Sequence, residues 1–259
     1  NAVVDNDIVP FEANIDGTYK GDTASIGFDY MSIETDYGNI DFTGVLDFKT
    51  YYPEGTARLY DIRLPNGNAL NGRIWIKPSG ERISLFGKKL YIEDSIFSNT
   101  VLSVLPYQNS YDFRFQTSIG APEDNTVTLD GNVETGPDPF IQISGEVRNL
   151  LLEKITNILV PEHANIPREI DFLNALHMNA EIFCTTDLTH YAFVCPEVEL
   201  FDPEKKENRV AFGLAGNNES IEISGAEISW DEYSATGFIT SSFSNTDEIT
   251  FSTSFTFEG

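Results

Sequence analysis

The chain is dominated by segments in which apolar and polar residues alternate one by one. The last of them is the plainest, because Ile249, Phe251, Phe255 and Phe257 alternate with serine and threonine. A period of two predicts β-strands with one covered face and one wet face, as in antiparallel sheets. Turns rich in Pro, Asn and Gly separate the segments, so we expect a meander of about 16 strands. The same alternation runs through residues 40–48, 111–119, 127–133 and 141–147.

A short glycine signature recurs within these segments. An apolar residue and one or two polar residues precede the glycine, as in Phe42-Thr43-Gly44. Gly17, Gly44 and Gly72 are spaced 27 and 28 residues apart, which indicates one supersecondary unit repeated along the chain. Glycine inside a strand marks a bend or a close approach by a backbone or a ligand. We therefore expect these glycines on the apolar face of a large curved sheet.

One region departs from the alternation. Residues 149–159 and 168–177 place leucine and isoleucine at helical spacing, and Pro161 follows the first of them. They predict two short amphipathic helices that cap the sheet or serve as its lid. The chain would then comprise a repetitive β region over 1–148, a helical insert over 149–177 and further strands over 178–259, in one continuous fold.

The net charge indicates which binding partners are disfavoured, and the cysteines bear on the compartment in which the protein works. A net charge of −25 and a pI near 4.2 argue against binding to nucleic acid or to an anionic membrane surface. Solubility explains this acidity, with calcium or a basic partner as alternatives. Cys184 and Cys195 flank a segment of ten residues, which fits a disulfide across a hairpin, and thus an extracytoplasmic protein, or two buried thiols. The chain has only three histidines, so we expect no metal site.

Catalytic motifs are missing from the sequence. No Gly-x-Ser-x-Gly, Gly-x-Gly-x-x-Gly or P-loop occurs, and acidic residues are too abundant for any pair of them to indicate a glycosidase. Trp75 and Trp230 lie in strand-like segments, where packing or a platform for a sugar ring would explain them. We expect a protein that is not an enzyme and that needs no cofactor, with a hydrolase as a minor alternative.

Two long segments share one pattern of strand, glycine and strand: IQISGEVRNLLLEKITNIL (residues 141–159) and the strands from Ala211 to Gly259. The segment NIDFTGVLDFKTYYPEGTARLYDIRL (39–64) has it too. In this pattern the chain resembles the AsmA-like/TamB superfamily of bacterial envelope proteins. The resemblance implies a curved antiparallel sheet shaped as a half-pipe, whose hydrophobic groove conducts phospholipid acyl chains in the periplasm or cell envelope. It implies no catalytic residues. It also implies a segment of a longer bridge, with flanking segments or other envelope proteins as partners.

An apolar sheet face must be covered by something. A lipid or another apolar ligand could cover it, while the polar side chains of the opposite face remain in contact with water. The alternative is a β-sandwich adhesin or carbohydrate-binding module, with aromatic residues such as Trp75, Trp230, Tyr51 and Tyr52 exposed on a flat face. The first interpretation predicts a ligand groove lined by seven phenylalanines: Phe42, Phe48, Phe113, Phe115, Phe251, Phe255 and Phe257.

Overall fold

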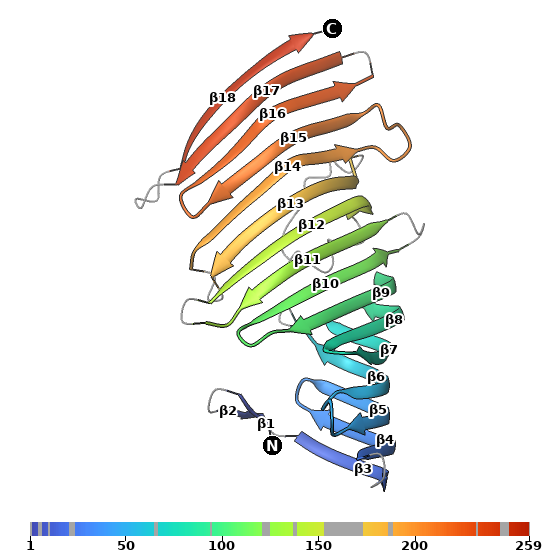
Figure 1. Ribbon diagram of the computed structural model, residues 1–259. Helices are drawn as coiled ribbons and strands as arrows, with labels where there is room; N and C mark the ends of the chain where they lie inside the picture. The colour runs from blue at the N-terminus through green and yellow to red at the C-terminus, as the bar shows by residue number, and fades with distance from the viewer. Residues whose placement is uncertain are drawn as a thin grey trace.

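The chain folds into one large antiparallel sheet (Figure 1). In the computed structural model, sixteen strands of the described residues follow one another in chain order from β3 to β18, each beside its sequence neighbour. Two further strands, β1 (Ala2–Val4) and β2 (Asp7–Val9), pair with each other in a separate sheet. The described residues are 2–4, 7–9, 11–20, 24–64, 67–93, 95–120, 125–136, 139–152, 173–185, 189–231, 233–243 and 249–258.

The strands are long and similar in length, nine to twelve residues each. The first eight of the large sheet are β3 (Phe11–Lys20), β4 (Ser25–Thr35), β5 (Gly38–Asp47), β6 (Pro53–Arg63), β7 (Ala69–Ser79), β8 (Arg82–Ile92), β9 (Ser95–Pro106) and β10 (Ser110–Ile119). The other eight are β11 (Thr126–Glu134), β12 (Phe140–Leu151), β13 (Ala175–Thr185), β14 (Tyr191–Phe201), β15 (Arg209–Asn217), β16 (Ser220–Trp230), β17 (Tyr233–Phe243) and β18 (Ile249–Glu258). The predicted all-β meander of about 16 strands is confirmed.

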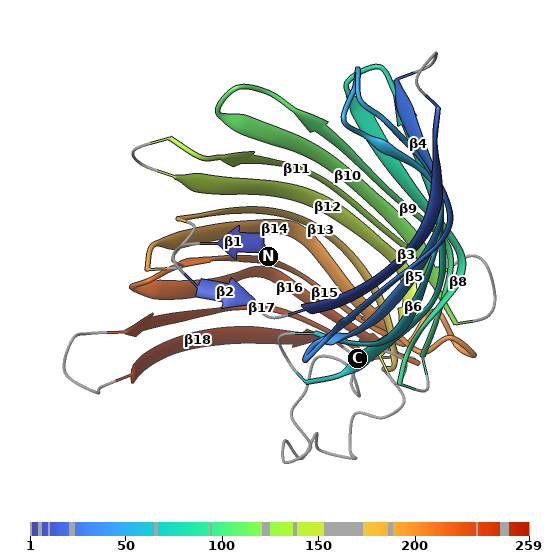
Figure 2. The ribbon, with the colours of Figure 1, turned by 90° about the horizontal axis from the view of Figure 1, so that it is seen from below.

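β-Bulges bend the strands near their middles. The pairing shifts by a residue between Leu59 and Ile62, between Val147 and Leu150, and in most other strand pairs. Asp61 and Asn149 lie in these two bulges with positive φ. A bulge bends its strand and increases the local twist. Accordingly the strands are arcs, and the sheet is curved and unclosed (Figure 2).

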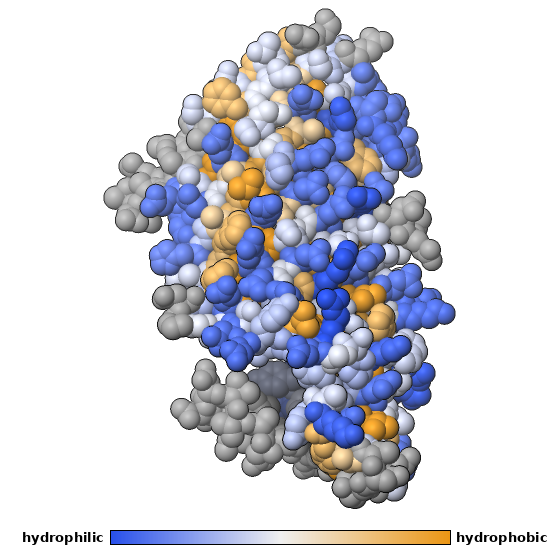
Figure 3. All heavy atoms as spheres, viewed as in Figure 1, coloured by the Kyte–Doolittle hydropathy of each residue, from blue (hydrophilic) through white to orange (hydrophobic). Residues whose placement is uncertain are grey.

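The apolar and polar positions separate onto the two faces of the sheet. Strand register places the apolar positions on one common face, which holds most of the buried hydrophobic residues, including Phe42, Ala57 and Leu90. We assign this apolar face to the concave side of the curved sheet, because the convex side carries the polar positions (Figure 2 and Figure 3). Between β9 and β13, Ile119, Val147 and Leu150 form a buried cluster on this face. The opposite, convex surface, which we call the outer face, is mostly hydrophilic (Figure 3).

The predicted helices are wrong at residues 149–151 and 175–177, whereas Leu152, the last described residue before the gap, is helical as predicted. Residues 149–151 continue β12, and residues 175–177 begin β13. A bulge places Val147 and Leu150 on the same face although they are three residues apart, so β12 extends past the end of the simple alternation. Residues 153–172, which hold the rest of the predicted helices, lie outside the described residues. Among the described residues, no helix is long and apolar enough to cross a bilayer.

The predicted disulfide is also wrong, because Cys184 and Cys195 are both free. The hairpin register pairs Cys184 with Tyr191, four residues before Cys195. Four residues of strand span about 13 Å, whereas a disulfide needs Cα atoms within about 7 Å. The Cys195 thiol is buried, and this desolvation raises its pKa. The β-sandwich alternative is wrong too, because the sixteen strands form a single sheet.

Candidate apolar binding face

The concave face has a continuous line of apolar positions across ten strands. One residue from each strand between β4 and β13 stands directly opposite its neighbour in this line, which we call the central file. At about 4.8 Å per strand the file is roughly 43 Å long, compared with roughly 30 Å for the hydrocarbon core of a bilayer. Its members are Phe28, Gly44, Gly55, Ile76, Leu85, Leu102, Phe115, Leu129, Gly145 and Ala180.

Large and small residues pack against each other at the end of this face formed by β4, β5 and β6. The Phe42 ring is 4% exposed and meets the Phe28 ring edge to face, with 5.9 Å between ring centroids. It also covers Gly44, where an added Cβ would lie 2.7 Å from Phe42 Cζ. Glycine is required here because the neighbouring ring and backbone occupy the space of a side chain. Gly44 therefore forms part of the floor on which this aromatic ring rests.

The same arrangement recurs at β10–β12. Phe113 stands opposite Gly131, and a Cβ on Gly131 would lie 2.5 Å from Phe113 Cε1. Phe115 stands opposite Leu129, whose side chain in turn covers Gly145. Both phenylalanines are half-buried, so their rings keep part of their surface accessible.

The remaining predicted groove residues differ in their positions. Phe255 covers Gly237 at the far end of the sheet, while Phe257 on the same strand is 78% exposed. Phe251 is paired with Ser241 in β18, and its side chain lies outside the described part. Phe48 departs from the prediction, because β5 ends at Asp47 and Phe48 lies in the following turn. The phenylalanines are thus distributed along the sheet and do not form one pocket.

Sequence reasoning missed several residues of the concave face. Phe193 covers Gly216 in the same way as Phe113 covers Gly131. Leu90 covers both Gly72 and Gly87. The bulges of β8 and β14 interrupt the alternation at these places. The signal that could have found them is an aromatic or leucine residue one strand away from a recurrent glycine.

Two buried hydroxyl groups on this face form a hydrogen bond with each other. Thr100 and Thr117 are both buried, and their hydroxyl groups form a hydrogen bond with 2.8 Å between the oxygen atoms. Thr117 also donates to the Ser98 carbonyl at 3.4 Å. Because the two hydroxyl groups are hydrogen-bonded to each other, they need no hydrogen bond from a ligand, and an apolar ligand can cover this part of the face.

The chain was compared with known proteins. No family model matches it, and no curated protein or solved structure does so either. Among the residues that the structure places, no three His, Cys, Asp or Glu side chains gather closely enough to hold a metal ion.

Proposed function

We propose that this chain is a lipid-binding or lipid-transfer module that holds acyl chains along its concave face. The observation that supports this most strongly is the central file, in which ten adjacent strands place apolar side chains or glycine on the inside of a curved sheet. Such a surface is stabilised when a ligand removes it from water, by about 25 cal/mol per Å² of apolar area. Acyl chains suit it because they need no hydrogen bonds and can lie along a strip.

The shape of the sheet suits a ligand that is extended. The file is roughly 43 Å long by strand spacing, so it offers room for more than one acyl chain end to end. Phe115 and Phe113 keep half-buried rings in the middle of this strip. We propose a binding role without catalysis, in which the chain shields apolar tails while their polar headgroups remain in water.

The setting of this function follows from the family resemblance. We propose that the chain works outside the cytoplasm, in the periplasm or cell envelope, next to other envelope proteins or to flanking segments of a longer bridge. The free cysteines remove the disulfide as a support for this location. Strands β3 and β18 each have a single neighbour in the sheet, which leaves an edge where flanking strands could pair.

Mass spectrometry of lipids extracted from the purified protein tests the proposal. We expect co-purified phospholipid with the unaltered chain, and its loss in Phe113→Asp and Phe115→Asp, because a carboxylate on the apolar concave face is poorly solvated. Gln116→Asp is the matched control, since Gln116 is the next residue along the strand and is exposed on the outer face. Circular dichroism must show that all variants are folded. Absence of lipid from the unaltered chain, or equal loss in Gln116→Asp, would contradict the proposal.

A further inference from the structure

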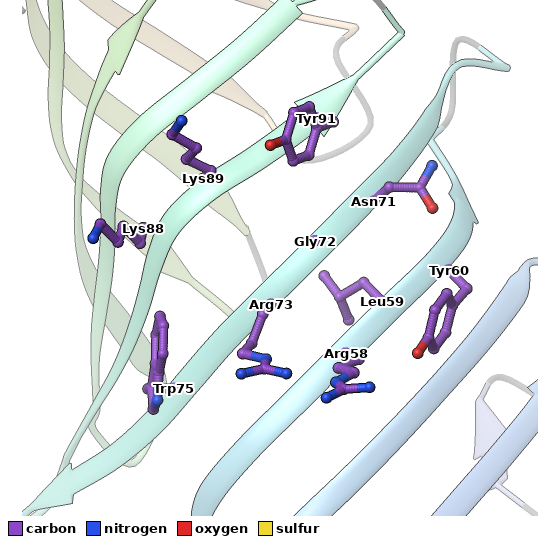
Figure 4. Close-up of a pocket in the computed structure, with 10 residues that line it drawn as sticks. All are labelled: Arg58, Leu59, Tyr60, Asn71, Gly72, Arg73, Trp75, Lys88, Lys89 and Tyr91. Carbon is purple, nitrogen blue, oxygen red and sulfur yellow. The ribbon is translucent and has the colours of Figure 1, made fainter.

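The outer face has a hollow in which cationic and aromatic side chains come together. It lies over β6, β7 and β8 and has a volume of about 660 Å³. Figure 4 shows the guanidinium groups of Arg58 and Arg73 side by side near Trp75, with Lys88 and Lys89 on the β8 side of the hollow. The hollow is on the face opposite to the central file, so it is a separate site.

Strand register brings the four cations together. Arg58 stands directly opposite Arg73 in the β6–β7 pair. On the other side, Arg73 faces the bulge of β8 that holds Lys88 and Lys89. Like charges that stand opposite each other on a sheet face destabilise it. A row of four cations is therefore costly to the fold, which a bound anion would offset.

Carboxylates of the protein offset this row only at its edges. Within the described residues, none of the four cations forms an ion pair. Asp41 stands opposite Arg58, but its carboxylate accepts a hydrogen bond from the Tyr30 hydroxyl at 3.2 Å. Asp61, near the rim, accepts one from the Asn71 amide at 3.1 Å. Asp41 therefore offsets part of the charge of Arg58, and the charges of Arg73, Lys88 and Lys89 remain available to a ligand.

The positive charge is local. Residues 53–92 contain seven Lys and Arg against three Asp and Glu, a net charge of +4 in a chain whose total is −25. Beyond β9 the outer face carries both signs of charge, because Asp130 pairs with Arg114 and Glu146 pairs with Arg148. Asp112 and Glu181 add further carboxylates to this face. A long polyanion or a flat anionic membrane would meet these carboxylates, and repulsion would weaken its binding. A compact anion fits the hollow better.

Aromatic side chains around the cations indicate a ring in the ligand. Trp75 is 41% exposed and stands opposite Phe86, which is 39% exposed. Tyr60 and Tyr91 are exposed to a similar extent and also line or flank the hollow. Exposed aromatic rings with a polar tip provide an apolar surface beside hydrogen-bonding groups. This combination suits the C–H face of a sugar ring.

We propose that this hollow binds a saccharide that bears an anionic group, a carboxylate, sulfate or phosphate. The guanidinium groups of Arg58 and Arg73 hold the anion through charge-assisted hydrogen bonds. Lys88 and Lys89 add positive charge, and Trp75 packs against the sugar ring. The site is independent of the proposed lipid function, because it uses the opposite face of the sheet.

Isothermal titration calorimetry with a sulfated uronate tetrasaccharide tests this proposal, with neutral maltotetraose and sodium sulfate as comparison ligands. We expect the anionic saccharide to bind more tightly than either, and more weakly as salt is added. Arg73→Gln should weaken binding by roughly tenfold or more, since it removes a charge-assisted hydrogen bond. Trp75→Ala should weaken it as well. Lys206→Gln is the matched control, because Lys206 is exposed away from the hollow.

Each possible result of these titrations either supports or overturns the saccharide proposal. Loss of binding in Arg73→Gln and Trp75→Ala, with full binding in Lys206→Gln, supports the proposal. Equal binding of maltotetraose, equal loss in Lys206→Gln, no binding of the anionic saccharide, or tighter binding to phosphatidylglycerol vesicles or single-stranded DNA would overturn it. Lipid content measured in Arg73→Gln should be unchanged. A failure at this site is therefore distinguishable from a failure of the lipid proposal.

Discussion

Replacing Gly131 by alanine tests whether the glycines support the aromatic rings of the concave face. The added Cβ would lie 2.5 Å from Phe113 Cε1 and 2.9 Å from the Gln142 carbonyl oxygen. One of these neighbours is backbone in the adjacent strand, and the other is an aromatic ring with few alternative positions. The ring must therefore rotate away from its place over β11, or the strands must shift.

Two opposing effects determine how much Gly131→Ala changes the free energy of unfolding. Alanine restricts the unfolded chain, which stabilises the fold by roughly 0.4–1 kcal/mol where the backbone permits it. Overpacking costs roughly 1–3 kcal/mol because side chains leave their preferred rotamers. The overlap with Phe113 and Gln142 is severe, so the second effect should prevail. We expect Gly131→Ala to lower the free energy of unfolding by about 1–2 kcal/mol.

Urea unfolding monitored by circular dichroism measures this change, through the midpoint at constant slope. Gly136→Ala is the matched control, since nothing lies within 4 Å of a Cβ at Gly136, and it should be neutral or slightly stabilising. Combining Gly131→Ala with Phe113→Leu should recover part of the loss, because the smaller side chain relieves the overlap. If Gly131→Ala is as stable as Gly136→Ala, the ring of Phe113 does not rest on this glycine, and the reasoning is refuted.

Three further predictions concern buried and exposed groups. Thr117→Val should destabilise the fold by about 1–3 kcal/mol in urea unfolding, because it leaves the buried hydroxyl of Thr100 without its partner; no loss would contradict the pairing. Cys195 should react with iodoacetamide more slowly than Cys184 near pH 8, because burial raises the pKa of its thiol and the thiolate is the reactive form; equal rates in the folded protein would refute this. Arg114→Gln should change the free energy of unfolding by less than about 1 kcal/mol, because its ion pair is exposed; a larger loss would show that this pair matters more.

The sequence predicted the strands and the composition of the two faces well. Alternation is a local property, and each strand buries one side independently of its distant neighbours, so the pattern survives in the fold. Bulges limited the prediction. Each bulge shifts the alternation by one residue, so the sequence pattern did not indicate that β12 continues to Leu151 or that Phe193 in β14 lies on the concave face.

The cationic hollow could not be predicted without the strand register. Arg58, Arg73 and Lys88 are 15 residues apart in sequence, which is a regular spacing, but only hairpin pairing shows that they are neighbours. The wrong disulfide prediction also resulted from the unknown strand register. Their separation in sequence was compatible with a cross-strand pair, whereas the turn places Cys184 opposite Tyr191.

Photocrosslinking with benzoylphenylalanine, placed in turn at positions 115 and 116, tests most directly whether lipid occupies the concave face. The two positions are adjacent in β10, but position 115 belongs to the central file and position 116 to the outer face. After irradiation of the protein purified with its natural lipids, we predict a lipid adduct in the mass spectrum for position 115 and none for position 116. No adduct at position 115, or equal adducts at both positions, would contradict the claim that the concave face binds acyl chains.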